Sequence, residues 1–258
     1  MFSLKLPIAS RRRFEIDAER GGDFVHRHLG VLGGQRLPES TYSAQVSADT
    51  PTIWWRMADS DSTMRDASGN TVHGDHLVGS SAAASLVPAS TNGARAFTGE
   101  VNQVSRSTIA APFNGTAWSC EFWLRTTSTF FGYGRTIVQG DEASVAGAFV
   151  MILVDGSGRI NIQNRDVAGH LLTYLSASGS VPVGAGTSAV HIVVTRTGST
   201  LAAYVNGSAV SLTLGTSSGW TGAENNFGTG VRIAANDYGG GAVESHTLDE
   251  IGRASCRE

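Results

Sequence analysis

Apolar and polar residues alternate in short runs along most of this chain, and small polar residues or glycine separate one run from the next. The clearest example is the stretch 189–210. Its runs His191–Arg196 and Leu201–Val205 are separated by a short turn, and Asn206–Gly207 then leads into a third run at 209–214. Asn-Gly between β-rich runs favours a type I′ turn, whose two central residues both need a positive φ. The pattern predicts three consecutive antiparallel strands.

The same pattern predicts a series of short strands from residue 52 onward. They lie near 52–57, 94–98, 101–106, 117–125, 135–139, 147–154, 158–163, 170–175, 189–196, 200–205, 209–214, 230–235 and 243–249. Regular short strands joined by turns of Gly, Ser, Asn and Asp are typical of a sandwich or barrel, not of βαβ units. Residues 42–48 have weak helical character, which stops before Pro51 because the residue ahead of a proline avoids the α conformation. We therefore predict an all-β, antiparallel two-sheet sandwich at 42–258, preceded by a short N-terminal arm or linker at 1–41.

Composition and charge exclude several classes of protein. The net charge of −3 provides no basic face for nucleic acid, and the basic cluster Arg11–Arg13 lies outside the predicted sandwich. No run approaches the roughly 20 apolar residues of a membrane span, so we predict no membrane insertion. The N-terminus is a poor secretory signal, because Lys5 interrupts its apolar stretch and the positive charge follows that stretch. A sandwich of this composition without an export signal favours a virion protein, although a fragment of a longer chain would look the same.

The two cysteines, Cys120 and Cys256, have no metal-type spacing and support no disulfide framework. Cys120 shares one face of a predicted strand with Trp118 and Phe122, which favours a buried free thiol. The last residues, Glu250–Glu258, read EIGRASCRE, and they can be encoded by read-through of a common sequencing adapter. Our hypothesis is that the natural chain continues differently after about Asp249.

Several short motifs together carry a resemblance to a known family. They are Tyr42, Ala48-Asp49, Pro51, Trp55-Arg56 and Asp59 at the start, then Asp66–Asn70 with Gly74, Gly93–Gly99, Trp118–Arg125, His191–Thr195 with Tyr204–Gly207, and Thr247–Glu250. The chain resembles, over about residues 42–250, the laminin-G-like jelly rolls of the concanavalin A-like lectin/glucanase superfamily. Such modules occur in phage tail proteins and bacterial surface proteins. The resemblance implies a jelly-roll topology, and it fixes a fold far better than a ligand.

The resemblance also implies a calcium ion between the early Asp-containing loop and the closing strand. Carried over to this chain, its ligands are Asp66, Asn70 and Asp249, with backbone carbonyls completing the shell. Calcium takes six to eight hard oxygen ligands, so such a set is chemically reasonable. The alternative is that Asp66–Asn70 forms an Asx-type turn capped by its own side chains.

Aromatic and amide side chains on the glycine-rich loops are the candidates for sugar binding. Aromatic rings stack on sugars, and amide or carboxylate groups bond to sugar hydroxyls, so exposed loops of this composition favour recognition. The residues are Tyr133, Trp220, Asn225, Asn226, Asn236, Asp237 and Tyr238. The alternative is that the aromatic side chains plug the open ends of the sandwich.

Catalysis is not predicted. Glu15, Asp17 and Glu19 resemble the carboxylate strand of family-16 glucanases, where alternate acids act as nucleophile and acid/base. Here, however, they precede the sandwich and adjoin a basic run, which favours chance.

The sequence thus predicts a non-catalytic recognition module, in a virion or on a cell surface, that binds a cell-surface glycan or another host-surface ligand through loops at one rim. Preformed loops on a rigid sheet lose little entropy on binding, which suits weak sites multiplied by many copies. The alternative is a structural decoration or assembly domain that contacts other virion tail proteins.

Overall fold

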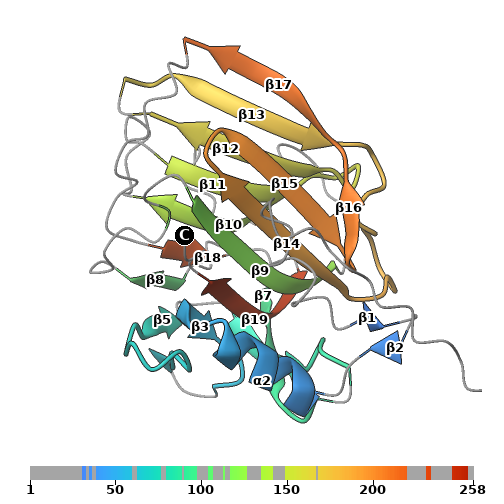
Figure 1. Ribbon diagram of the computed structural model, residues 1–258. Helices are drawn as coiled ribbons and strands as arrows, with labels where there is room; N and C mark the ends of the chain where they lie inside the picture. The colour runs from blue at the N-terminus through green and yellow to red at the C-terminus, as the bar shows by residue number, and fades with distance from the viewer. Residues whose placement is uncertain are drawn as a thin grey trace, which may run out of the picture.

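The computed structural model describes residues 31–32, 35–36, 39–59, 63–76, 80–88, 90–97, 104–106, 113, 117–126, 135–141, 149–166, 168–219, 231–233 and 246–254. Within these ranges the chain forms two antiparallel sheets stacked face to face, with a helix against the outer face of one of them (Figure 1). The predicted all-β two-sheet fold is confirmed.

The larger sheet has nine strands among the described residues, and every neighbouring pair is antiparallel. In order across the sheet, they are β17 (Leu212–Ser218), β13 (Leu171–Ser176), β12 (Ile160–Arg165), β11 (Phe149–Val154), β10 (Arg135–Asp141), β18 (Val231–Ile233), β8 (Val104–Arg106), β5 (Gly74–His76) and β4 (Thr63–Met64).

The second sheet has eight strands in the same described ranges. In order they are β16 (Ser208–Val210), β15 (Thr200–Val205), β14 (Val190–Thr197), β9 (Ala117–Thr126), β19 (His246–Ala254), β7 (Gly93–Phe97) and β6 (Ser80–Ala84), with β3 (Pro51–Trp55) pairing with β19. A separate ladder joins β1 (Val31–Leu32) to β2 (Gln35–Arg36), and α2 spans Glu39–Ala48.

Alternation along the strands builds the core between the two sheets. On β9, Trp118, Cys120, Phe122 and Leu124 all point inward and are buried, and within the described ranges Cys120 takes part in no disulfide, as predicted. From the opposite sheet, Ile152 of β11 is fully buried in the same cluster. No helix in the described ranges is long and apolar enough to span a membrane.

The predicted hairpin series is confirmed, with one correction. Asn206 and Gly207 have φ values of 47° and 84°, as a type I′ turn requires. The run 209–214, however, is not one strand. The structure ends β16 at Val210 and begins β17 at Leu212 in the other sheet, so the chain crosses from one sheet to the other here. Alternation alone does not reveal such a crossing, because both strands keep the same period.

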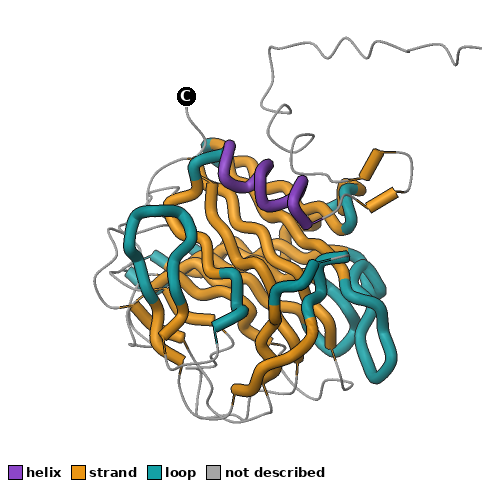
Figure 2. The backbone as a smooth tube through the Cα atoms, turned by 90° about the horizontal axis from the view of Figure 1, so that it is seen from below, coloured by secondary structure: helices purple, strands orange, loops and turns teal. Residues whose placement is uncertain are grey.

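Two further differences lie near the N-terminal end. The short strands β4, β5 and β6 were not predicted, since segments such as Ser80–Ala84 have little apolar alternation. The helix begins at Glu39, ahead of the predicted boundary at residue 42, and it packs on the sandwich (Figure 2). At the other end, residues 250–254 continue β19 and pair with β3; the adapter hypothesis for them stays a prediction.

Candidate functional site

The central strand β12 presents a row of polar side chains away from the core. In its sequence INIQNR, Ile160 and Ile162 are fully buried between the sheets. Asn161, Gln163 and Arg165 alternate with them, so they lie on the outward face, and each is half-buried. Residues two apart on one face of a strand recur about every 7 Å, so the row extends over about 13 Å.

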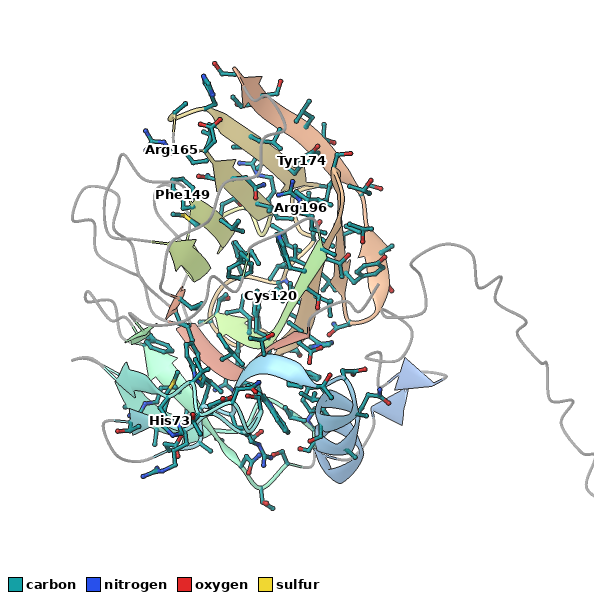
Figure 3. All side chains as sticks on the ribbon, turned by 60° about the vertical axis from the view of Figure 1, so that its left-hand side comes forward. His73, Cys120, Phe149, Arg165, Tyr174 and Arg196 are labelled. Atoms are coloured by element: carbon teal, nitrogen blue, oxygen red, sulfur yellow. The ribbon has the colours of Figure 1, made fainter. Side chains whose placement is uncertain are left out.

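Apolar and hydroxyl side chains flank this row on both neighbouring strands. The register places one residue of β11 and one of β13 opposite each polar residue. From one end to the other, the three sets are Phe149–Arg165–Leu171, Met151–Gln163–Thr173 and Leu153–Asn161–Leu175. The three β11 residues form a small apolar cluster of their own, against which Leu171 packs. The result is an outward patch with a polar centre and apolar sides, which we call the β12 row (Figure 3 labels Phe149 and Arg165).

Two polar atoms of the β12 row are buried without a hydrogen-bond partner in the described part of the chain. They are the Oδ1 atom of Asn161 and the Nη1 atom of Arg165. A buried polar group without a partner costs about 1–3 kcal/mol, so such groups are uncommon in folded proteins and call for an explanation. A ligand could satisfy these two atoms only if their side chains turned outward, because neither atom is exposed.

A tight hairpin turn holds the Arg165 end of the row. Asp166 accepts hydrogen bonds from the backbone N–H of His170 at 2.8 Å, and its other oxygen lies 2.8 Å from Nδ1 of the His170 ring. Burial by itself would raise the pKa of Asp166, but the hydrogen bonds and charge of His170 outweigh it and lower that pKa. Gly169 has a φ of +87°, which favours glycine, and its α-carbon faces the guanidinium group of Arg165.

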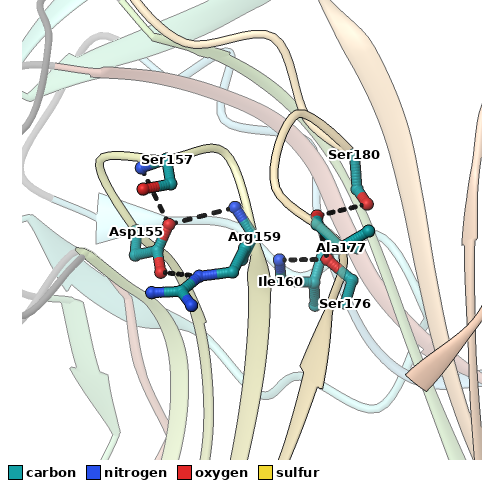
Figure 4. Close-up of polar contacts among 7 residues, drawn as sticks. All are labelled: Asp155, Ser157, Arg159, Ile160, Ser176, Ala177 and Ser180. Carbon is teal, nitrogen blue, oxygen red and sulfur yellow. Dashed lines mark hydrogen bonds and ion pairs between the residues drawn. The ribbon is translucent and has the colours of Figure 1, made fainter. Parts of the chain in front are cut away.

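The turn at the opposite end of β12 follows the same design, with an arginine in place of the histidine. Asp155 accepts the backbone N–H groups of Ser157 and Arg159 at 2.9 and 3.1 Å, and Arg159 Nε donates to its second oxygen at 2.6 Å (Figure 4). The neighbouring loop closes over this turn, because Val181 N–H donates to the carbonyl of Gly158 at 2.8 Å. This end of the sandwich is therefore tied down by hydrogen bonds within the protein.

The predicted calcium ligand Asp66 is the centre of a tight turn. Its Oδ1 accepts from the backbone N–H groups of Trp54 and Ser68 at 2.9 and 3.0 Å. Its Oδ2 accepts from Ser68 Oγ at 2.6 Å and from Val72 N–H at 3.0 Å. These four bonds form the capped turn of the alternative interpretation, and a cation would have to displace some of these donors.

Of the other two predicted ligands, Asn70 lies in the Asp66 turn, because its backbone N–H donates to the Ser68 hydroxyl that bonds to Asp66, whereas Asp249 lies on β19. The Asn70 amide donates to the carbonyls of Pro51 and Thr52 at 3.2 and 3.1 Å. The strand β3 lies between the Asp66 turn and β19, and the backbone of Asp249 pairs with Trp123 on the far side of β19. Among the described residues, no group of three or more His, Cys, Asp or Glu could hold a metal ion. Calcium binding stays a prediction.

The predicted sugar-binding residues all lie outside the described residues. These are Tyr133, Trp220, Asn225, Asn226, Asn236, Asp237 and Tyr238. The described residues on either side of these segments lie at two different ends of the sandwich. The segment 220–230 connects Gly219 and Val231, which lie at the Asp166 end of the larger sheet. The segments 127–134 and 234–245 begin and end at the opposite, Asp155 end. Glu15, Asp17 and Glu19 are also outside the described residues.

A buried acid–base pair occupies the outer face of the other sheet. Oε2 of Glu121 lies 3.3 Å from Nε2 of His191, an ion-pair contact without the alignment of a hydrogen bond. Trp123 stacks on the His191 ring at 5.1 Å, and Tyr42 of α2 donates to Glu121 Oε1 at 3.4 Å. Both side chains are nearly fully buried beneath the helix, so this pair does not face solvent.

The β12 row was not among the predicted sites, although the sequence contains a signal for it. The predicted strand 158–163 covers most of INIQNR, and its strict alternation of isoleucine with amides places Asn161 and Gln163 on one face. The sequence does not show that β12 lies in the middle of a sheet whose outward face is half-buried. That position follows from pairings with β11 and β13.

A family model described as the concanavalin A-like lectin/glucanases superfamily matches residues 98–245. A comparison with curated protein sequences finds no match. Among solved structures, domain 4 of AbnA, an extracellular GH43 arabinanase from Geobacillus stearothermophilus in complex with arabinotriose, has a TM-score of 0.54 at 13% identity. That alignment covers 80% of this chain and 94% of the arabinanase domain.

Two toxin domains are similar in the same way. The botulinum neurotoxin serotype D ligand-binding domain in complex with N-acetylneuraminic acid has a TM-score of 0.56 at 15% identity, covering 83% of this chain and 49% of that domain. The binding domain of Paraclostridial mosquitocidal protein 1 has a TM-score of 0.57 at 13% identity, covering 81% and 50%. The chain therefore spans about half the length of these toxin domains. At such identities the likeness shows the fold alone.

Proposed function

This chain belongs to the concanavalin A-like lectin/glucanases superfamily, and from that premise we propose that it is a non-catalytic carbohydrate-recognition module. The single observation that carries the proposal is the β12 row, a line of amide and guanidinium groups between apolar side chains on the outward face of the nine-stranded sheet.

The chemistry of the row suits a glycan. Asn161 and Gln163 each offer one acceptor and two donors, which match sugar hydroxyl groups, and Arg165 adds donors for a hydroxyl or carboxylate group. Apolar neighbours such as Met151 and Leu171 can cover the C–H faces of sugar rings. Because sheet positions are rigid, little conformational entropy is lost on binding.

The comparisons support the proposal by example. The arabinanase domain and the neurotoxin domain, which share this fold, were each solved with a sugar, arabinotriose in one and N-acetylneuraminic acid in the other. Because the identities are 13% and 15%, neither sugar is carried over as the ligand of this chain.

A glycan array followed by calorimetry tests the proposal. We expect one or more glycans to bind the wild-type protein, and Gln163→Ala or Arg165→Ala to weaken that binding by about tenfold, since each removes a bond to the ligand. The matched control is Gln45→Ala, which removes an amide from α2 on the other side of the molecule. Unchanged affinity in both β12 variants would rule out the row as the site. No glycan binding at all would favour the assembly-domain alternative.

The finer parts of the proposal have separate tests. The loop residues Tyr133 and Trp220 extend the site if Tyr133→Ala or Trp220→Ala abolishes array binding. Calcium binding at Asp66 is tested by calorimetry with calcium and by the melting temperature in chelator. The non-catalytic assignment requires that no reducing sugar is released from bound glycans. Placement on a phage tail or bacterial surface is tested by the genes that flank this one.

A further inference from the structure

The strand β17 is the longest free sheet edge in the described part of the chain. Five strands have a single neighbouring strand in the two sheets, namely β17, β4, β6, β16 and β3. They contain seven, two, five, three and five residues respectively. β17 pairs with β13 along its length, so its other edge carries backbone N–H and C=O groups with no neighbouring strand among the described residues. Such an edge is a template for another strand.

The residues of β17 lack the usual protection of a free edge. The segment Leu212–Ser218 contains no charged residue and no proline, and all its residues except Leu212 are exposed. Natural edge strands are commonly blocked by charges, by proline or by being very short. Leu214 is 51% exposed and is the exposed large hydrophobic residue of the described chain.

One irregularity limits where a second strand can pair. The register with β13 shifts at Gly215, where an added Cβ would lie 2.7 Å from Thr173 Oγ1. This bulge divides the strand into two regular parts, Leu212–Leu214 and Thr216–Ser218, and the first of them carries the apolar side chains. Leu212 packs against the core between the sheets, and Leu214, two residues further, is on the same face.

We propose that two copies of this chain associate through β17, antiparallel and with Thr213 on the two-fold axis, so that their nine-stranded sheets become one continuous sheet. This register places Leu214 of each copy opposite Leu212 of the second copy. The contact is self-complementary, because the strand is uncharged and no like charges face each other. A contact of one strand from each copy is small, so the dimer is weak and depends on concentration.

The dimer has a geometric consequence for ligand binding. A two-fold axis perpendicular to the joined sheet keeps both outward faces on the same side. Between the two β12 strands lie β13 and β17 of each copy, so five strand spacings of about 4.8 Å separate the two β12 rows by about 24 Å. If the proposed glycan binding holds, one extended or clustered glycan can engage both rows, which raises the apparent affinity. The dimer itself does not rest on that function.

Sedimentation velocity from about 1 to 200 μM, around the 26.9 kDa monomer mass, is the first test. We expect the wild-type protein to move from monomer to dimer, and Leu214→Lys to raise the dissociation constant at least tenfold. Because Leu214 is exposed, this variant should keep the wild-type melting temperature. Ser81→Lys places the same charge on the exposed edge strand β6 and should leave the dimer unchanged. A monomer at every concentration, or a dimer that Leu214→Lys does not weaken, overturns the proposal.

A cross-link then tests the register. In a Cys256→Ser background, Thr213→Cys places two thiols directly opposite each other at the two-fold axis, within reach of a disulfide. We expect a covalent dimer on mild oxidation, and none from Ser81→Cys. A wild-type dimer without a cross-link at position 213 would overturn the proposed register of the two β17 strands. A dimer that binds no glycan would contradict the proposed function and leave this inference standing.

Discussion

The outer faces of the two sheets differ in what covers them. On the eight-stranded sheet, α2 packs Tyr42 and Val46 onto Trp54 and Trp123 and buries the Glu121–His191 pair. On the nine-stranded sheet, the β12 row leaves amide and guanidinium groups half-buried, two of whose atoms have no partner in the described residues. The first face contributes to folding. The second retains polar groups that a ligand can satisfy.

This difference separates two roles of a polar side chain in a sheet, which are to pack beneath another element or to remain available to a ligand. Glu121 and His191 contact each other beneath the helix and are nearly fully buried, so they offer nothing to solvent. Asn161 and Arg165 contribute little to stability in the free protein, because burying an unsatisfied atom is a cost. The comparison therefore predicts that mutations on the two faces affect different measurements.

The largest expected effect is on the covered face. Trp123→Ala removes a buried indole ring that contacts Tyr42 and stacks on His191, so we expect the free energy of unfolding to fall by about 3–5 kcal/mol. Urea denaturation measures it. A loss below about 1 kcal/mol would mean that α2 does not cover this face in solution.

The next effect concerns the buried pair. Glu121→Leu leaves His191 beneath α2 without its carboxylate, and we expect a cost of about 3 kcal/mol. The double variant Glu121→Leu/His191→Leu should be more stable than the single one, because no buried imidazole is left without its carboxylate. Denaturation curves measure the free energy of unfolding of each variant. If the double variant loses as much as Glu121→Leu, or as much as the two single variants together, the two side chains are not paired.

The outward face should respond in the opposite way. Gln163→Ala should change the free energy of unfolding by less than about 0.5 kcal/mol, because its half-buried side chain lies on a face that α2 does not cover. Glycan affinity should still fall about tenfold, as calorimetry would measure. A stability loss as large as that of Trp123→Ala would erase the distinction between the two faces.

The smallest effect is a dependence on pH at the end of the β12 row. The pKa of Asp166 is lowered in the folded protein, so its contribution to stability is present above the ordinary value of 3.8 and is lost as the pH falls through the lowered value. Asp166→Asn should therefore reduce stability at neutral pH slightly and flatten the acid side of a melting-temperature profile. If the melting-temperature profiles of the wild-type protein and Asp166→Asn run parallel down to about pH 2.5, the Asp166 carboxylate does not bond to His170 in solution.

The residues that could be predicted are those whose role depends on local pattern. Asn206–Gly207 specifies its turn through its own backbone preference, and Cys120 lies on the apolar face of β9 by alternation. The crossing between Val210 and Leu212 was missed because two strands in different sheets have the same period. The Asx-type turn at Asp66 was one of two local interpretations, and only the bonds from Trp54 and Val72 show what the carboxylate contacts.

By itself, the sequence determined which residues of each strand share a face, because the two-residue period of a strand is a local property. It also determined the all-β class and several turns. Only the tertiary structure decided what each face meets. Whether α2 covers Trp123, whether the β12 row stays half-buried, and whether β17 ends a sheet all depend on pairings between segments far apart in the chain. Those pairings depend on the packing of the whole core, and no short stretch of sequence contains them.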